Sequence, residues 1–472
     1  MDRTDAIDKI FRNVLREITP TEEERKEISA VIEKVKRVVE SAIKPKGLSF
    51  TIAGSYMRDT WMRDKKEFDI FIMFPVSYSR EGLEKEGLKL GKEIVKRVKG
   101  KYKIAYAEHP YVRAVIDGYD VDIVPCYKVE SAHRIKSSVD RTPFHNEWLS
   151  KHLLKDLVDE VRLFKQFCKG IGVYGSDAKT QGFSGYLCEL LIIHYRSFKN
   201  LLKNASEWKP GKVVINLEGE ITDTESLYKK FPFQPLIVID PVDPGRNVAA
   251  ALSPENFIYF VSCCKAFLRK PSKRFFYKQP VKFLRKNIEN LIKKRGTKLI
   301  AISFPAPDII SDVLWPQLRK TGRRLKNMIE EGEFKVMNWS VWSDEKKICL
   351  ILFEFEVWEL PKIRKLYGPS IFSEKHTKQF VKKYESLGRI WVENNQWVSE
   401  VKRKLKTPED MFRETLKSDE KTLRIKGIPS YTAQSLSKKF KILREREILK
   451  LGSSNEEFGE FLVSFFKRDI KW

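Results

Sequence analysis

The chain has 472 residues, too many for a single hydrophobic core, and its hydrophobic (42%) and aromatic (12%) contents exclude an intrinsically disordered protein. Its 90 lysines and arginines exceed its 64 aspartates and glutamates, giving a net charge of +26. This excess suits a polyanionic partner such as nucleic acid or an anionic membrane.

The first 130 residues predict a mixed α/β unit. Thr21 to Glu24 have the pattern of a capping box, and apolar residues then recur at helical spacing from Ile28 to Ile43. Asp117-Gly118 is a hairpin signal between two strand patterns. The further elements expected here are strands over Leu48–Ala53, Phe68–Phe74, Tyr102–Ile116 and Tyr119–Cys126, and helices over Tyr56–Arg63 and Glu81–Val98.

Helical patterns dominate the middle of the chain. Thr142-Pro143 predicts a helix start, with the Thr142 hydroxyl as the N-cap and proline at the first helical position. Apolar stripes predict helices over Glu160–Lys169 and Gly185–Leu202. A short apolar strand, Leu236–Ile239, then leads to a turn at 243–246.

The chain becomes more basic after Pro271. A strand over Thr297–Phe304, a helix over Asp312–Glu331 and a hairpin over Phe334–Val357 form a β-α-β-β order, which predicts a small split α/β sandwich of the ferredoxin-like kind. Lys375–Trp472 combines basic amphipathic helices with a hairpin around Asn394-Asn395. We therefore expect an α+β multidomain protein divided into residues 1–148, 149–268 and 269–472.

Cysteine spacing and hydropathy favour a soluble cytoplasmic protein. The six cysteines show no paired spacing and lie in apolar surroundings, as expected for buried thiols of a reducing compartment. No apolar run reaches the roughly 20 residues of a membrane span. The N-terminus lacks the apolar region of a signal peptide, so we expect no membrane partner.

Three acidic residues are the candidate metal ligands. Glu67 and Asp69 are two residues apart on one strand, so both point to the same face, and Asp122 adds a third carboxylate from another strand. Acids grouped on an apolar strand repel each other unless a cation lies between them, and Mg²⁺ prefers such oxygen ligands. Asp120 has the same parity as Asp122 and is its rival. The alternative is that Glu67 and Asp69 lie at a sheet edge and pair with lysines and arginines.

A small-residue turn precedes the acids. Gly54 lets the backbone approach a phosphate closely, and the amides that open the following helix carry a positive dipole. Ser55 can donate its hydroxyl, and Arg58 can reach the same anion one turn later. Alone, a Gly-Ser pair is usually a helix cap; followed by the acidic strand, it predicts a triphosphate site.

This combination resembles the nucleotidyltransferase superfamily that includes DNA polymerase beta. Further motifs are similar to those of the archaeal, class I CCA-adding enzymes: 68–71 (Phe-Asp-Ile-Phe), 106–111 (Tyr-Ala-Glu-His-Pro-Tyr), 121–127 (Val-Asp-Ile-Val-Pro-Cys-Tyr), 138–145 (Ser-Val-Asp-Arg-Thr-Pro-Phe-His), 182–191 (Gly-Phe-Ser-Gly-Tyr-Leu-Cys-Glu-Leu-Leu), 240–243 (Asp-Pro-Val-Asp) and 246–250 (Arg-Asn-Val-Ala-Ala). The resemblance begins near residue 25, extends to the C-terminus and is clearest over the first 250 residues.

The resemblance implies an enzyme that adds C, C and A to the 3′ end of tRNA from CTP and ATP without a nucleic-acid template. It implies a palm-type mixed sheet in a catalytic head, a helical neck that completes the nucleotide pocket, and a basic tRNA-binding body and tail. It also implies a two-metal Mg²⁺ site. Carried over by residue, Glu67, Asp69 and Asp122 would hold the metals; Gly54, Ser55, Arg58, Thr142, His145, Lys165 and Tyr174 would surround the triphosphate; and Arg246 would read the incoming base.

Each of these secondary residues has an ordinary alternative. Thr142 could simply cap a helix, and His145 could lie on a helix face. Lys165 could be solvated, Tyr174 could pack between helices, and Arg246 could form a salt bridge. The residues proposed to grip RNA in the basic C-terminal half have the same alternative, that of solvated surface charges: Lys320, Arg323, Arg324, Lys402, Arg403 and Lys404.

Other functions remain open from the sequence. A poly(A) polymerase-like or oligoadenylate-type nucleotidyltransferase would use the same carboxylates, and a non-catalytic RNA-binding protein could keep the fold. A membrane-surface protein is disfavoured because no segment sets a cleanly apolar face against a basic one. Formation of a homodimer is left open.

Overall fold

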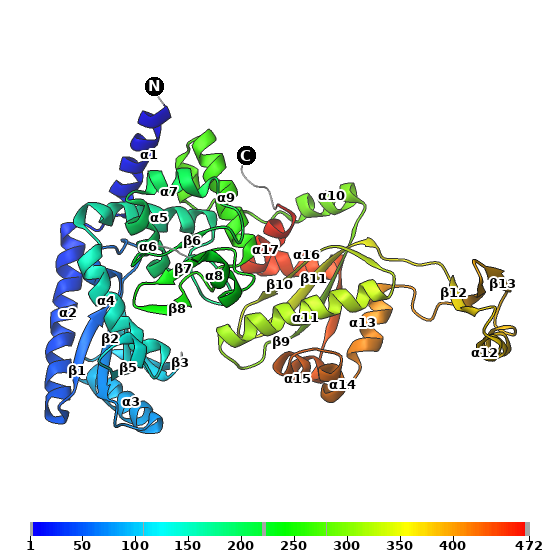
Figure 1. Cartoon of the computed structure of the whole chain (residues 1–472), viewed down its shortest axis with the longest axis horizontal. Helices are drawn as coiled ribbons and strands as arrows, with labels where there is room; N and C mark the ends of the chain where they lie inside the picture. Colours follow the sequence, from blue (N-terminus) through cyan, green and yellow to red (C-terminus); the bar gives the residue numbers. More distant parts are fainter. Residues whose placement is uncertain (1–2, 107, 220–222, 280, 468–472) are drawn as a thin grey trace. The chain divides into compact units, whose positions relative to one another are not determined.

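The computed structural model describes residues 3–106, 108–219, 223–279 and 281–467 (Figure 1). Ala107, within one of the motifs above, lies outside the described residues. The chain divides into two compact units: the first reaches Gln279, and the second holds the described residues from 281 onward. Each unit is described by itself.

The first unit begins with a mixed sheet whose strand order is β1-β2-β5-β4-β3. Its strands are β1 (Ser49–Ala53), β2 (Glu67–Pro75), β3 (Lys101–Tyr106), β4 (Pro110–Ile116) and β5 (Tyr119–Lys128). β2 and β5 are parallel, and the other pairs are antiparallel. The expected hairpin at Asp117-Gly118 is confirmed, since both residues have positive φ.

Two helices cover one face of this sheet (Figure 1). α2 (Glu22–Ile43) begins at Thr21 with the expected capping box, and α3 (Arg80–Arg97) begins at Ser79. Their apolar sides pack against alternate residues of β2, including Phe68, Ile70 and Ile72. Because side chains alternate along a strand, Glu67, Asp69 and Phe71 lie on the opposite face.

Two elements differ from the sequence prediction. Tyr102–Ile116 is not one strand but β3 and β4, which turn back on each other before Pro110. Residues 107–109 (Ala-Glu-His) include neither glycine nor asparagine, so the sequence has no turn signal between the two strands. Tyr56–Arg63 is not a helix of that length: a single 3₁₀ turn, Ser55–Arg58, stops where Asp59 takes a left-handed φ of 55°.

The rest of the first unit is mainly helical, around a core rich in phenylalanine. Its longer helices are α1 (Arg3–Ile18), α4 (Thr142–His152), α5 (Val158–Ile171), α6 (Gly185–Tyr195), α7 (Phe198–Ala205) and α9 (Pro254–Arg269). The helix predicted over Gly185–Leu202 is divided into α6 and α7, because Arg196 is left-handed and Ser197 caps a new helix. Thr142 is not an N-cap, since α4 follows directly from a 3₁₀ turn and its cap position is Arg141.

A small sheet of order β6-β7-β8 completes the first unit. Its strands are β6 (Val214–Ile215), β7 (Ile237–Asp240) and β8 (Asp243–Asn247), and α8 (Thr224–Lys230) precedes β7. The turn expected at residues 243–246 is therefore a strand. The reversal occurs just before it, between Asp240 and Asp243, which pair across the hairpin.

The second unit confirms the β-α-β-β prediction. β9 (Lys298–Pro305), α11 (Ser311–Glu331), β10 (Lys335–Ser343) and β11 (Ile348–Val357) follow one another, and the sheet order is β10-β11-β9-β15. A separate small sheet has the order β12-β14-β13, and its Asn394-Asn395 turn has two positive φ values, as the hairpin signal predicted. The remaining elements are α10 (Arg285–Arg295), β12 (Ile363–Ser370), α12 (Glu374–Tyr384), β13 (Ile390–Glu393), β14 (Gln396–Lys402), α13 (Pro408–Leu416), α14 (Glu420–Ile425), α15 (Ser430–Lys438), β15 (Lys441–Arg444), α16 (Glu445–Ser454) and α17 (Glu456–Phe466).

The expectation of buried cysteine thiols is met within the described part of the chain. All six cysteines are buried thiols, and none of them forms a disulfide within the described residues. None of the helices described has the length and apolar character to span a bilayer.

Candidate active site

Four carboxylates lie together on the face of the first sheet opposite α2 and α3, next to a small buried cluster on the same face that includes Phe71 and Cys126. Because β2 and β5 run parallel in register, Glu67 pairs with Asp120 and Asp69 pairs with Asp122. The turn after β1 comes close to the same acids: Gly54 has a φ of +100°, and a Cβ added there would lie 3.4 Å from Asp69 Oδ2. Glycine adopts this positive φ without the strain that a side chain would bring, and the turn can therefore pass close to the carboxylate.

Each acid has a different electrostatic environment. Glu67 is exposed and receives a 2.9 Å hydrogen bond from Lys65, as the sheet-edge alternative expected. Asp69 is half-buried; burial, then repulsion from Asp122 and Glu67, raises its pKa to about 7, against the opposing pull of Arg113 and Arg58.

Asp122 is held by a neighbouring arginine. The Arg113 guanidinium on β4 donates two hydrogen bonds to it, at 2.7 and 2.6 Å, and a third to the Tyr111 hydroxyl. Sequence reasoning missed Arg113, although the Asp117-Gly118 hairpin contains the signal: counting back from the turn places residue 113 opposite residue 122.

The side-chain positions do not form a closed metal cage. Among residues 3–106, 108–219, 223–279 and 281–467, no group of three histidine, cysteine, aspartate or glutamate side chains is arranged to hold a metal ion. The strand register nevertheless places hard oxygen donors side by side, and the raised pKa of Asp69 marks a site short of positive charge. The donor set therefore fits a divalent cation.

A second cluster surrounds the fully buried Glu189 of α6. Lys165 Nζ and Thr60 Oγ1 donate to this carboxylate at 3.1 and 2.6 Å, and Arg58 Nε donates at 3.1 Å. Burial acts to raise the pKa of Glu189, but Lys165, Arg58 and Thr60 outweigh it and hold the pKa at about 2. The solvated alternative for Lys165 is thus excluded, because its side chain is buried.

Two further residues belong to this region. Tyr174 is half-buried, and its hydroxyl lies next to Gly185, beside the Lys165 ammonium. Ser55 is half-buried and opens the 3₁₀ turn that carries Arg58. Sequence reasoning also missed Glu189, although it lies within one of the motifs. Its cationic partners, Lys165 and Arg58, are more than 20 residues away in the chain, so no local pattern connects them.

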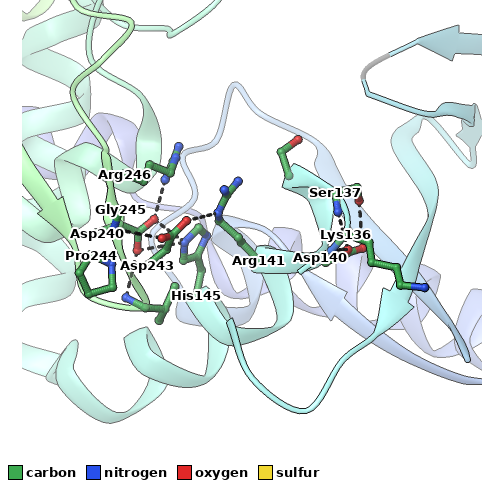
Figure 2. A network of polar contacts seen from close by, with 12 residues as sticks. Lys136, Ser137, Asp140, Arg141, His145, Asp240, Asp243, Pro244, Gly245 and Arg246 are labelled. Atoms are coloured by element: carbon green, nitrogen blue, oxygen red, sulfur yellow. Dashed lines mark hydrogen bonds and ion pairs between the residues drawn. The ribbon is translucent and has the colours of Figure 1, made fainter. Parts of the chain in front are cut away.

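A third group lines a cavity of about 980 Å³, which includes Thr142, His145 and Arg246. Figure 2 shows His145 and Arg246 converging on Asp240 at the end of β7. The Asp240 carboxylate accepts hydrogen bonds from Arg246 at 2.7 Å and from Tyr186 at 3.2 Å, and lies 2.9 Å from His145 Nε2. The salt-bridge alternative for Arg246 is present, and His145 also stacks on Tyr186.

Asp240 is the third residue that sequence reasoning missed. Its carboxylate is fully buried; burial alone would raise its pKa, but the contacts with His145, Arg246 and the Val242 amide lower it. Arg141, at the start of α4, pairs similarly with Asp243 at 2.7 Å (Figure 2). Asp240 therefore fixes the orientation of two residues predicted to touch the nucleotide.

Helix α4 connects these groups. Asn146, next to His145, accepts a 2.7 Å hydrogen bond from Arg58 and donates a longer one to the Ile52 carbonyl of β1. The acidic face, the Glu189 cluster and the cavity thus belong to one connected part of the first unit.

Family models and known proteins match most of the length of the chain. Three family models match in succession: the nucleotidyltransferase domain over residues 32–145, the second domain of tRNA nucleotidyltransferase over 159–277, and the C-terminal domain of CCA-adding enzyme over 295–445. The CCA-adding enzyme of Methanocaldococcus jannaschii is 39% identical, covering 90% of this chain and 94% of its own. That of Methanosarcina acetivorans is 39% identical, covering 95% and 96%. Among solved structures, a cytoplasmic RNA terminal U-transferase matches 59% of this chain and 100% of its own, with 14% identity and a TM-score of 0.46.

Proposed function

The chain belongs to the CCA-adding enzyme family and adds CCA by nucleotidyl transfer, and from this premise we propose how its residues carry the reaction. The substrates are the 3′ end of tRNA, CTP and ATP. The RNA 3′-hydroxyl attacks the α-phosphorus in line, the α–β anhydride bond breaks, and pyrophosphate leaves without any nucleic-acid template. Residues 1–148 form the catalytic head, 149–268 the helical neck and 269–472 the RNA-binding part, and the protein works in the cytoplasm.

Glu67, Asp69 and Asp122 would hold Mg²⁺. The observation that carries this assignment is the register of Asp69 beside Asp122, with the Gly54 turn passing close to them. When bound, Mg²⁺ would neutralise phosphate charge and polarise the attacking hydroxyl. Arg113 keeps the Asp122 carboxylate oriented by its paired hydrogen bonds.

The triphosphate and the base of the incoming nucleotide bind in adjacent parts of the first unit. Arg58 and Lys165 together carry two positive charges against the single negative charge of Glu189, so the cluster remains attractive to an anion. Gly54, Ser55 and Tyr174 supply the remaining contacts to the phosphates. Thr142 and His145 border the same space, and Arg246, oriented by Asp240, reads the edge of the base.

One assay tests this function. RNA ending at the discriminator nucleotide is offered with CTP alone, ATP alone, or both, and the products are sized. We expect two additions with CTP alone and three with both nucleotides. Long adenylate tails, or equal use of all nucleotides, would instead favour a poly(A) polymerase-like activity. Binding without any extension would favour the non-catalytic alternative.

RNA affinity should fall steeply with salt. Of the residues expected to grip RNA, Lys320, Arg323, Lys402 and Lys404 are exposed, whereas Arg324 pairs with Glu331 and Arg403 with Glu333. If the four exposed residues contact phosphates, affinity should drop about a hundredfold between 50 and 200 mM salt. Fluorescence anisotropy measures it, and Lys402→Ala should reduce the logarithmic slope by about one. A flat salt dependence would contradict the basic surface as the RNA site.

A further inference from the structure

Phe233 is an exposed aromatic residue in a costly backbone conformation. Its side chain is 99% exposed, and its φ of 64° is left-handed, which a bulky residue rarely adopts. The Phe233 side chain is not buried, so no packing energy offsets the cost of its exposure or of its left-handed backbone. Strained, exposed residues that persist in a fold are typical of ligand contacts.

The loop that carries Phe233 is anchored at both ends. The Phe231 amide donates to the Leu227 carbonyl of α8, and the Pro235 carbonyl accepts from the Gly211 amide, each at 2.9 Å. Lys230 also donates to the Pro244 carbonyl of β8. The loop is therefore held in place while its most apolar side chain faces solvent.

Phe233, the left-handed residue of this loop, differs from its neighbours in its relation to the cavity. Phe231, Pro232 and Gln234 line the 980 Å³ cavity, whereas Phe233 does not. Gln234 Oε1 is buried with no hydrogen-bond partner among the described residues, as expected of a group that faces a ligand space. The cavity side is thus available to the incoming nucleotide, and the Phe233 side chain lies next to the cavity without lining it.

We propose that Phe233 is a stacking platform for the unpaired 3′-terminal nucleotide of the RNA acceptor. The inference rests on the proposed function, since it assigns a place to the second substrate beside the nucleotide cavity. Single-stranded RNA is recognised by aromatic rings next to positive charge, and the exposed Lys229 and Lys230 directly precede this loop. The stacked base would place the RNA end at the rim of the cavity, and Phe233 acts as a positioning residue.

The test compares RNA hairpins with and without an unpaired 3′ nucleotide, using the full chain. Phe233→Ala should raise the KM for the overhanging hairpin by about 5- to 150-fold, with kcat at saturating RNA and the KM for CTP unchanged. Affinity for the blunt hairpin should not change, because it offers no free base. Phe233→Trp should restore the KM. Compared with the wild type, which has ten tryptophans of its own, this variant should show additional fluorescence quenching by the overhanging hairpin but not by CTP or ATP alone.

Two variants separate stacking from folding. Phe233→Gly should melt at the same or a higher temperature, since glycine accepts the left-handed backbone, yet bind the overhanging hairpin as weakly as Phe233→Ala. Leu154→Ala, which truncates another exposed apolar residue of the first unit, should leave the KM unchanged. Equal losses for blunt and overhanging RNA, or quenching by free CTP, would overturn the inference, while normal CCA addition by the wild type would leave the proposed function intact.

Discussion

Replacing Asp69 by alanine should lower the rate of nucleotide addition by at least about 10²- to 10³-fold, because metal ligands supply several kcal/mol of transition-state stabilisation. RNA affinity should stay nearly unchanged, since the acid lies on the sheet face and contributes no positive charge. Extension of radiolabelled RNA under single-turnover conditions measures the rate, and anisotropy measures the affinity. An active Asp69→Ala enzyme would refute the metal assignment.

Asp120 offers a matched control for this experiment. It lies on the same face and pairs in register with Glu67, but it is exposed. Asp120→Ala should retain activity, whereas Asp122→Ala should behave like Asp69→Ala; the reverse result would make Asp120 the third ligand.

The same site should couple stability to metal and pH. The folded-state pKa of Asp69, about 7, lies above its unfolded value, so wild-type stability declines as the pH rises from about 3.8 through 7. Asp69→Asn should remove this decline and melt at a higher temperature than the wild type above pH 7 in metal-free buffer. Adding Mg²⁺ should raise the melting temperature of the wild type but hardly that of the variant.

The acidic face was predictable because its signals are local. Period-two alternation placed Glu67 and Asp69 on one face of their strand and Asp122 in line with a neighbouring strand, and the parallel register of β2 and β5 then pairs Asp69 with Asp122. The capping box at Thr21 and the β-α-β-β order of the second unit were equally readable. Where the prediction of elements was wrong, single left-handed residues such as Asp59 and Arg196 interrupted otherwise continuous patterns.

The partners of the predicted residues were not predictable, because they come from distant segments. Arg58 and Lys165 are 107 positions apart in the chain and meet only because both face Glu189. Likewise His145 and Arg246 meet at Asp240, which the sequence presents as part of a proline-rich turn. Burial of these carboxylates depends on helix packing, which periodicity alone does not specify.

The stability of the first unit should depend strongly on Glu189. Glu189→Leu should destabilise the first unit by about 3–5 kcal/mol, because it leaves the buried Lys165 charge and the partly buried Arg58 charge without their counter-ion. For a unit of this size the melting temperature should fall by roughly 6–20 °C in calorimetry of the whole chain. Adding Lys165→Met to Glu189→Leu should recover part of the loss, since one uncompensated charge is removed. Full stability of the single variant would show that water reaches these cations.

The stability lost in Glu189→Leu should depend on pH, because the pKa of Glu189 is lowered in the folded protein. Glu189 has a folded-state pKa of about 2, below its ordinary value of 4.5, so its stabilising effect is complete above pH 4.5 and is lost as the pH falls toward 2. The difference between wild type and Glu189→Leu should therefore be constant near neutral pH and shrink in acid. A difference that instead grew in acid would mean that the carboxylate is not the group that holds Arg58 and Lys165 in place.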